Sequence, residues 1–503
     1  MEDSRGSRIA KNTVFLYGRM LLSMIVTLYT SRVVLNSLGA IDYGVYNVVT
    51  GFVVSFGFLN SAMHASVQRF LTVEMKKNNS KKLNQIFSMG VTIHFILALV
   101  MVIIAEPIGL YFVQNKLVIP IDRMEAALWI FHLSIVSLFF GIMNVPYKAL
   151  IIARENMGAF AAISLIEVFA KLGIAITLVF CIIDKLILYA VLLVMVAVAI
   201  QFFYMWYCIS NYEEGRFKRF WDRKLFNKMS SFAGWNLIGV FAGIVYNQGV
   251  NIVLNIFGGP IVNAARAIAF QVSGAANQLV TNFQLAANPP IMKAYATKDN
   301  SVFRLLSSSS KLSYILLLFI IVPFIIECPY ILNIWLKNVP EYSIDFTRLA
   351  MVDILICSLA GPLHTLMQAT GSIRKYQIIV SGLLLMNLPL SYIMLKLGFG
   401  FNATFVVSII LSFVALVIRY ILLRSFIEYR LWDLIVGFAL PIIILTIISI
   451  IMPYFFYCLM KPGLIRLIII CLASCFSVAV ISWIGVLDKG EKSLFLQIIK
   501  RKK

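Results

Sequence analysis

The chain has 503 residues, of which 61% are hydrophobic and only 13% are charged, and its mean hydropathy is +0.91. Soluble globular domains are about half apolar and about a quarter charged, so this composition excludes that class and predicts an all-α polytopic membrane protein. Lys and Arg number 43 against 22 Asp and Glu, and this net charge of +21 must first be tested against the positive-inside rule.

Fourteen segments are apolar over the roughly 20 residues that a helix needs to cross about 30 Å of hydrocarbon. In chain order they are residues 14 to 35, 43 to 67, 86 to 110, 126 to 146, 158 to 181, 186 to 209, 232 to 256, 262 to 288, 312 to 333, 347 to 369, 377 to 396, 401 to 423, 433 to 456 and 464 to 486. The connections are too short for a soluble catalytic or ATP-binding domain, and no GxxxxGK[ST] motif occurs. No Cys or His cluster has metal-ligand spacing, so we expect no metal and no cofactor.

The connections alternate sharply in positive charge. The set that includes both termini holds 30 Lys and Arg, and the opposite set holds only six. Those six are Lys116, Arg123, Lys185, Lys337, Lys396 and Lys461. This asymmetry predicts that both termini are cytoplasmic. Because topology accounts for most of the positive excess, a nucleic-acid partner is not expected.

A short motif recurs along the chain. The sequence VLNSLGA at residues 34 to 40 is repeated as VLNIFGG at residues 253 to 259, which is an offset of 219 residues. The same offset aligns spans one and two with spans seven and eight. Six spans separate equivalent points, so both copies enter the membrane in the same direction. We therefore expect two parallel six-helix lobes, residues 1–210 and 211–430, followed by residues 431–503 with two further helices and a basic tail. The seam between such lobes is where transporters hold a substrate.

Basic side chains lie deep within several spans. Each costs roughly 2.5 to 3.5 kcal/mol at mid-bilayer, so Arg19 and Arg266 should face protein or a wet cavity rather than lipid. Helical phase places Arg266 on one face with Ser273 and Asn277.

Polar faces of this kind occur in two other spans. Arg19 shares a face with Ser23, and Asn236 and Asn247 lie on a stripe of span seven that also carries two glycines. Such faces either bind helices together or line a cavity, and for the two arginines we favour a cavity that binds an anion. Arg32 joins it only if the first helix bends, and is otherwise an interfacial anchor.

Acidic residues are scarce within the spans. Glu167 precedes Lys171 by four residues, which favours a structural ion pair over a proton relay. Asp353 shares a helical face with His364, and these two are the candidates for coupling to an ion or a proton. The interior is therefore net positive, which suits an anionic substrate such as a phosphate-bearing lipid.

Residues 11 to 70, and Ser31 to Gly39 with Asp42 to Asn47 most clearly, resemble the opening helices of Wzx-type polysaccharide biosynthesis proteins. These belong to the multidrug/oligosaccharidyl-lipid/polysaccharide exporter superfamily and have a MATE-like fold. The resemblance implies a flippase that moves undecaprenyl-diphosphate-linked oligosaccharide across the bacterial inner membrane for O-antigen, capsule or exopolysaccharide assembly, with other assembly proteins as partners. The lipid II flippase branch is similar in its fourteen helices and in cavity arginines on helices one and eight, which implies this role for Arg19 and Arg266. In that branch the last two helices form a groove for the lipid tail.

Two other functions remain as alternatives. A multidrug cation exporter of the same superfamily requires unpaired acids in its cavity, whereas this chain offers arginines. A membrane enzyme of the O-antigen polymerase or ligase type usually carries a sizeable periplasmic loop, which this chain lacks. We therefore expect a transporter rather than an enzyme.

Overall fold

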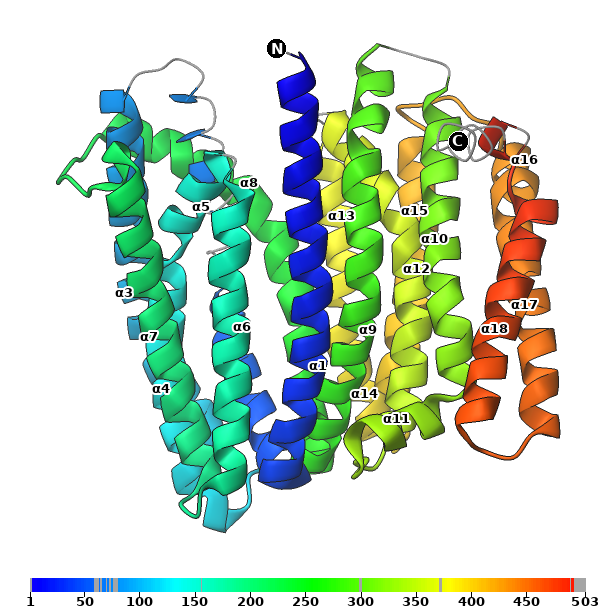
Figure 1. The fold of residues 1–503 in the computed structure, drawn as a ribbon, viewed down its shortest axis with the longest axis horizontal. Coiled ribbons are helices and arrows are strands. Elements are labelled where there is room, and N and C mark those ends of the chain that lie inside the picture. The colour runs from blue at the N-terminus through cyan, green and yellow to red at the C-terminus, as the bar shows by residue number, and fades with distance from the viewer. Residues whose placement is uncertain are drawn as a thin grey trace. The chain divides into compact units, whose positions relative to one another are not determined.

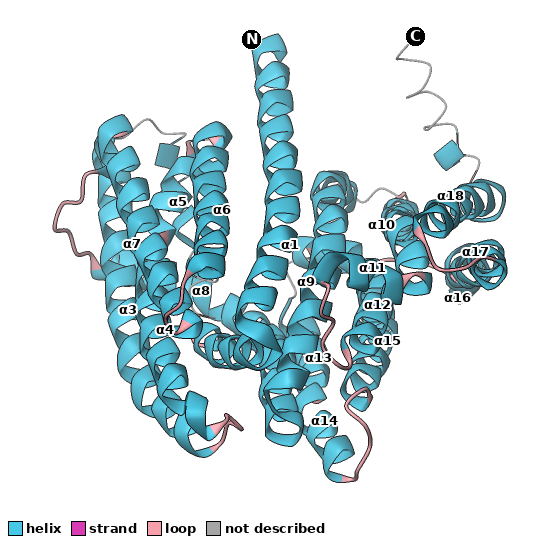
Figure 2. Ribbon diagram, turned by 60° about the horizontal axis from the view of Figure 1, so that its bottom comes forward, coloured by secondary structure: helices cyan, strands magenta, loops and turns pink. Residues whose placement is uncertain are grey.

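The computed structural model describes residues 2–57, 63, 66–68, 70–71, 74–75, 80–154, 156–297, 301–370, 373–488 and 490–492. Every regular element in these ranges is helical (Figure 2). The first half contains α1 (Glu2–Ser55), α3 (Ser80–Asn115), η1 (Ile121–Arg123), α4 (Met124–Met143), α5 (Val145–Ala153), α6 (Met157–Phe180), α7 (Lys185–Asn211), η2 (Glu213–Gly215), α8 (Arg223–Ile244), η3 (Val245–Gly249) and α9 (Val250–Ala296). The second half contains α10 (Val302–Ile326), α11 (Cys328–Leu336), α12 (Ser343–Ala369), α13 (Ile373–Leu385), α14 (Asn387–Lys396), α15 (Ala403–Leu423), α16 (Leu431–Leu434), η4 (Ile435–Ala439), α17 (Leu440–Leu459), α18 (Leu464–Ile481) and η5 (Ser482–Val486).

Twelve helices in the described residues are long and apolar enough to cross a membrane. Two of them, Gly18–Ser55 and Phe241–Gln284, are much longer than a bilayer requires. Each is interrupted by a glycine outside helical geometry, Gly39 (φ 79°) in α1 and Gly259 (φ 70°) in α9. Each therefore carries two of the predicted spans, one before and one after the kink. The twelve helices thus account for the fourteen predicted spans within the described residues, although part of the second span, including residues 58–62, lies outside them.

The two kinks refine the sequence repeat. The offset of 219 residues pairs Gly39 with Gly258, but the structure turns at Gly259, one residue later. Both glycines combine a positive φ with an extended ψ, a region that only glycine occupies readily. The repeated motif thus marks the turn where each long helix reverses.

Two compact units make up the chain, Met1–Ala267 and Ile268–Lys503. In the first unit, α1 packs along α6 and α4, while α4 also packs against α3 and α7 (Figure 1). Apolar side chains of α1 and α4, such as Val45, Val49 and Phe131, form one core, and a second core surrounds Phe87. Because the first unit ends at Ala267, it includes the first part of α9. The predicted lobe boundaries at residues 210 and 430 stay predictions.

In the second unit, α12 packs against α10 and α15, and α17 and α18 form a pair that contacts α10. Tyr314 on α10 and Thr446 on α17 share a hydrogen bond of 2.7 Å between their hydroxyls. Lys311 on α10 donates to the carbonyl of Val486 at 3.4 Å. The two C-terminal helices are therefore attached to the second unit through α10.

The ninth span differs in position from the prediction of 312 to 333. Helix α10 begins at Val302 and ends at Ile326, before the Cys328–Pro329 step that starts the short helix α11. Its N-terminal part contains a run of serines that hydropathy alone assigns to a loop. Ser310 and Ser313 are fully buried, and Ser310 donates to the carbonyl of Leu359 on α12, so packing rather than apolarity keeps this stretch helical.

Candidate functional site

A cluster of charged side chains lies within the membrane-spanning helices of the first unit. Arg19 is half-buried on α1, Lys148 is half-buried on α5, and Lys171 is exposed on α6. Arg19, Lys171 and Glu167 all lie within electrostatic range of the Lys148 ammonium. The cluster therefore holds three cations against one carboxylate, in a setting where each uncompensated charge is costly.

Aromatic rings support two of these cations. The Arg19 guanidinium lies 5.0 Å from the ring centroid of Phe160 on α6, and the Lys148 ammonium lies 5.2 Å from that of Tyr204 on α7. Such cation–π contacts stabilise a cation without neutralising it. The buried Nε of Arg19 has no hydrogen-bond partner among the described residues. It remains a donor for an incoming acceptor.

Glu167 binds the nearest of the three cations. Lys171 Nζ donates to Glu167 Oε1 at 2.7 Å, across one turn of α6. This contact occupies the only carboxylate of the cluster. Arg19 and Lys148 are therefore the cations that remain for an anion.

Arg266 lies elsewhere in the first unit, and its side chain is 6% exposed. Its Nη2 donates to the backbone carbonyl of Asn247 at 2.8 Å. Asn247 belongs to η3, a π-helical turn in which carbonyls lose their ordinary i to i+4 partners. Here Arg266 satisfies one such carbonyl, and Asn247 Nδ2 donates to the carbonyl of Gly243 at 3.0 Å.

Arg19 and Arg266 lie at different depths. Arg19 precedes the Gly39 kink by about 30 Å of helix, whereas Arg266 follows the Gly259 kink by about 10 Å. Gly44 packs so closely on Pro260 that any Cβ there would overlap the Pro260 carbonyl, so the two kinks lie near one level. The structure therefore does not bring the two arginines together at one point of the first unit.

Other predicted residues are distributed along the chain. Arg32 is half-buried near the Gly39 end of α1, while the side chain of Asn236 lies outside the described residues. In the second unit, Ser273 is 3% exposed and donates to the carbonyl of Phe270 at 3.3 Å, and Asn277 is half-buried one helical turn later. On the same face, Gln284 donates to Ser313 and to the carbonyl of Ser358, so part of this face joins helices.

The two candidates for ion coupling lie on α12. Asp353 Oδ1 accepts from Ser412 on α15 at 2.6 Å. His364 Nε2 lies 3.0 Å from Gln368 Nε2, and its ring lies 5.8 Å from that of Tyr376 on α13. Arg419 Nε donates to the hydroxyl of the same Tyr376 at 3.0 Å. No group of three metal-ligating side chains occurs in the described part of the chain.

Sequence reasoning overlooked two features of the first unit. The predicted spans leave Lys148 in a cytoplasmic connection, but it lies on α5, in the helical stretch Ile121–Ala153 that is long and apolar enough to cross a membrane. The apolar run that continues past Pro146 is the signal that could have revealed this. Glu106 on α3 is a further acid inside a span, and its Oε1 lies 2.7 Å from Nδ1 of His132 on α4. Its position near the end of the predicted third span concealed it.

Solved structures share this architecture. An inward-facing multidrug resistance MATE family transporter of the MOP superfamily matches with a TM-score of 0.67 and 12% identity, over 82% of this chain and 97% of that chain. The lipid II flippase MurJ, in an inward closed conformation, matches with a TM-score of 0.67 and 14% identity, over 93% of this chain and 98% of that chain. The chain shares the fold of these MATE and MurJ structures.

A MOP-superfamily transporter from Pyrococcus furiosus also matches, with a TM-score of 0.56 and 13% identity, over 82% of this chain and 95% of that chain. The sequence matches no family model and has no significant match among curated proteins. The MATE-like fold predicted from the sequence is therefore confirmed, and these neighbours with the MOP-superfamily fold are transporters and flippases.

Proposed function

We propose that this protein is a flippase that moves undecaprenyl-diphosphate-linked oligosaccharide across the bacterial inner membrane by alternating access. The observation that carries the proposal is the cation cluster of Arg19, Lys148 and Lys171 inside the spans of the first unit. A diphosphate bears two or more negative charges, and it crosses hydrocarbon only if cations of the protein and a water-filled path take the place of bulk water around it. A cation-rich surface at membrane depth meets this need.

The cluster has a division of roles in this proposal. Arg19 presents a guanidinium with an unoccupied Nε, suited to paired contacts with phosphate oxygens, and Lys148 adds a compact positive charge. Glu167 accepts a hydrogen bond from Lys171. A phosphate oxygen could replace this carboxylate when the substrate binds, and the return of the carboxylate to Lys171 would release the phosphate on the far side. Phe160 and Tyr204 hold the two free cations in place through their ring faces.

The fold supports the same substrate class. The lipid II flippase MurJ matches 93% of this chain, whereas the MATE transporter matches 82%. In our proposal α17 and α18 accompany the lipid tail, as the family resemblance implies. Arg266 with Arg32, Asn236, Asn247, Asn277 and Ser273 would line the path of the headgroup in other conformations. Arg266 must then leave the Asn247 carbonyl, and Asp353 and His364 remain the proposed coupling residues.

The experiment is a double substitution, Arg19→Gln with Lys148→Gln, in a strain whose surface glycan depends on this protein. We expect loss of both cations to reduce surface glycan at least tenfold and to accumulate lipid-linked repeat units on the inner leaflet, because two phosphate contacts disappear. Exposed Lys116, a cation outside the cluster, provides the matched control as Lys116→Gln and should leave export unchanged.

The leaflet on which intermediates accumulate separates the alternatives. A polymerase or ligase variant would accumulate repeat units on the outer leaflet. A multidrug cation exporter would leave the glycan intact and instead alter resistance to cationic drugs. Either result would refute the flippase proposal.

A further inference from the structure

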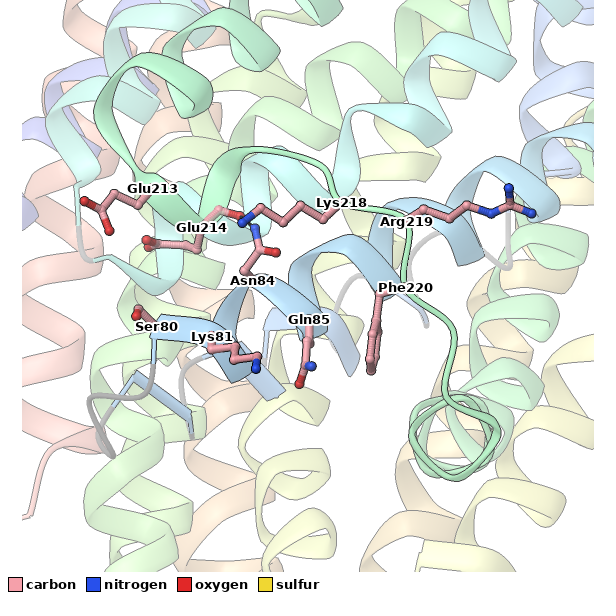
Figure 3. A pocket seen from close by; sticks show the side chains of 9 residues that line it. All are labelled: Ser80, Lys81, Asn84, Gln85, Glu213, Glu214, Lys218, Arg219 and Phe220. Carbon is pink, nitrogen blue, oxygen red and sulfur yellow. Dashed lines mark hydrogen bonds between the residues drawn. The ribbon is translucent and has the colours of Figure 1, made fainter.

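A second basic site lies outside the membrane-spanning cluster, where the first turns of α3 meet the linker between α7 and α8. A cavity of about 400 Å³ opens there. Figure 3 shows Lys81, Asn84 and Gln85 on α3, with the linker from Glu213 to Phe220 crossing above them. This region belongs to the set of connections that we predict to be cytoplasmic.

The lining of this pocket is net positive. Lys81, Lys218 and Arg219 contribute three positive charges, against the carboxylates of Glu213 and Glu214. Glu214 is 3% exposed, and its Oε1 accepts from Arg154 Nε at 2.6 Å, so its charge is already balanced. The three cations of the lining therefore outnumber its single unbalanced carboxylate, that of Glu213.

The linker is held in a defined shape above α3. Asn84 Nδ2 donates to the carbonyls of Glu214 and Arg216 at 3.0 and 2.7 Å. Ser88 Oγ accepts from the backbone N–H of Lys218 at 3.1 Å. These bonds position the linker cations before any ligand arrives, which lowers the entropic cost of binding.

Exposed aromatic side chains alternate with the linker cations. Phe217 is 51% exposed and Trp221 is 54% exposed, and Arg216, Lys218 and Arg219 beside them are exposed as well. An exposed tryptophan such as Trp221, beside Lys and Arg, is typical of a segment at the level of the lipid headgroups. From this pattern we expect the pocket to open at the level of the bilayer phosphates.

We propose that this pocket, between the start of α3 and the 213–220 linker, binds the phosphate of an anionic phospholipid headgroup in the cytoplasmic leaflet. Lys81 and Lys218 contact the phosphate, and Asn84 and Gln85 offer amide groups to the polar part of the headgroup. The pocket uses α3 and the linker, whereas the cation cluster uses α1, α5 and α6. The inference therefore does not rest on the proposed substrate of the flippase.

The test uses the full-length protein in neutral detergent, titrated with phosphatidylglycerol or phosphatidylcholine and monitored by native mass spectrometry. We expect phosphatidylglycerol to bind more tightly, and Lys81→Gln with Lys218→Gln to weaken that binding by about tenfold or more, since each lysine near a lipid phosphate contributes about 1 kcal/mol. The control, Lys224→Gln with Lys228→Gln, removes two exposed cations outside the pocket and should leave the affinity unchanged.

Three results would overturn this inference. They are equal affinity for the two lipids, equal affinity of the pocket variant and the control, or competition by millimolar inorganic phosphate, which would assign the pocket to free phosphate. If the double variant fails to fold, Lys81→Gln alone carries the test, because this side chain is exposed in the first turn of α3. Glycan export in the same variants distinguishes a failure here from a failure of the flippase proposal.

Discussion

At the scale of single residues, the charges buried in the second unit are explained by their partners. Glu327, fully buried between α10 and α11, faces Arg466 of α18, which is 7% exposed. Arg466 Nη2 donates to Glu327 Oε2 at 2.8 Å, and its Nε lies 2.6 Å from Oε1. The Tyr457 ring lies 4.5 Å from the guanidinium carbon. This enclosed pair joins α18 to the end of α10.

Removal of one partner tests this interpretation. We expect Glu327→Ala to destabilise the protein by about 3 kcal/mol or more, because Arg466 is left as an uncompensated buried charge. Glu327→Met with Arg466→Leu removes both charges and should recover most of that loss. Thermal unfolding of both variants in detergent checks the difference. Equal destabilisation by the single and double variants would show that packing rather than charge is responsible.

At the scale of elements, the reversals of the two long helices depend on backbone geometry and on a buried amide network. Asn255 Nδ2 donates to Asn263 Oδ1 at 2.9 Å, and Asn263 Nδ2 donates to the Asn251 carbonyl at 2.7 Å, which bridges the Gly259 kink. Asn255 Oδ1 also accepts from the backbone N–H of Val118 at 2.7 Å. The equivalent residue of the first repeat, Asn36, is exposed. The two turns share glycine geometry but not their surroundings.

Glycine replacement isolates the backbone contribution. We expect Gly259→Ala to cost about 1 to 3 kcal/mol, since a Cβ at φ 70° with an extended ψ is strained even though no neighbour lies closer than 3.9 Å. Gly173→Ala is the control, because Gly173 lies within α6 with open space around it and should tolerate alanine or gain stability. Denaturant midpoints would measure both. An unchanged midpoint for Gly259→Ala would mean that the kink relaxes without penalty.

At the scale of the whole molecule, the distribution of positive charge predicts its orientation. The predicted span boundaries assign thirty Lys and Arg to the side of both termini and six to the other, and placing Lys148 on a span lowers the first number to 29. During insertion, the membrane potential and the anionic lipids of the cytoplasmic leaflet both favour keeping Lys and Arg on the cytoplasmic side. The count assumes that successive connections lie on alternate sides of the membrane. The helices of the structure agree with this assumption, because each of the two kinked helices supplies two spans.

Reporter fusions test the orientation. A reporter that is active only in the cytoplasm should be active after Lys503 and inactive when inserted beside Lys116, whereas a periplasmic reporter should show the reverse. Insertion beside Lys461 provides a second outer position. The same activity at residues 116 and 503 would contradict the orientation, because an even number of spans separates the termini but an odd number separates these two sites.

The sequence by itself determined the features that depend on local composition. Hydropathy is additive along a segment, so fourteen spans follow from counting, and the repeated VLN motif with its glycine marks the reversals to within one residue. The directions of the spans stay a prediction from the charges of the connections. The burial cost of a charge likewise indicates that Arg19 and Arg266 avoid lipid. Boundaries were less well predicted where packing rather than apolarity keeps a helix intact, as in the serine-rich start of α10.

Only the tertiary structure decided which charges meet. Lys148 joins Arg19 and Glu167, while Arg266 binds the Asn247 carbonyl at another depth. Glu106 finds His132 on the next helix. Most of these partners lie on different helices and are far apart in sequence. The contact of Arg266 depends on a π-helical turn, which the hydrophobic periodicity of the sequence does not indicate. Electrostatic pairing is set by distances of a few ångströms between helices, and such distances arise from the packing of the whole unit rather than from any one segment.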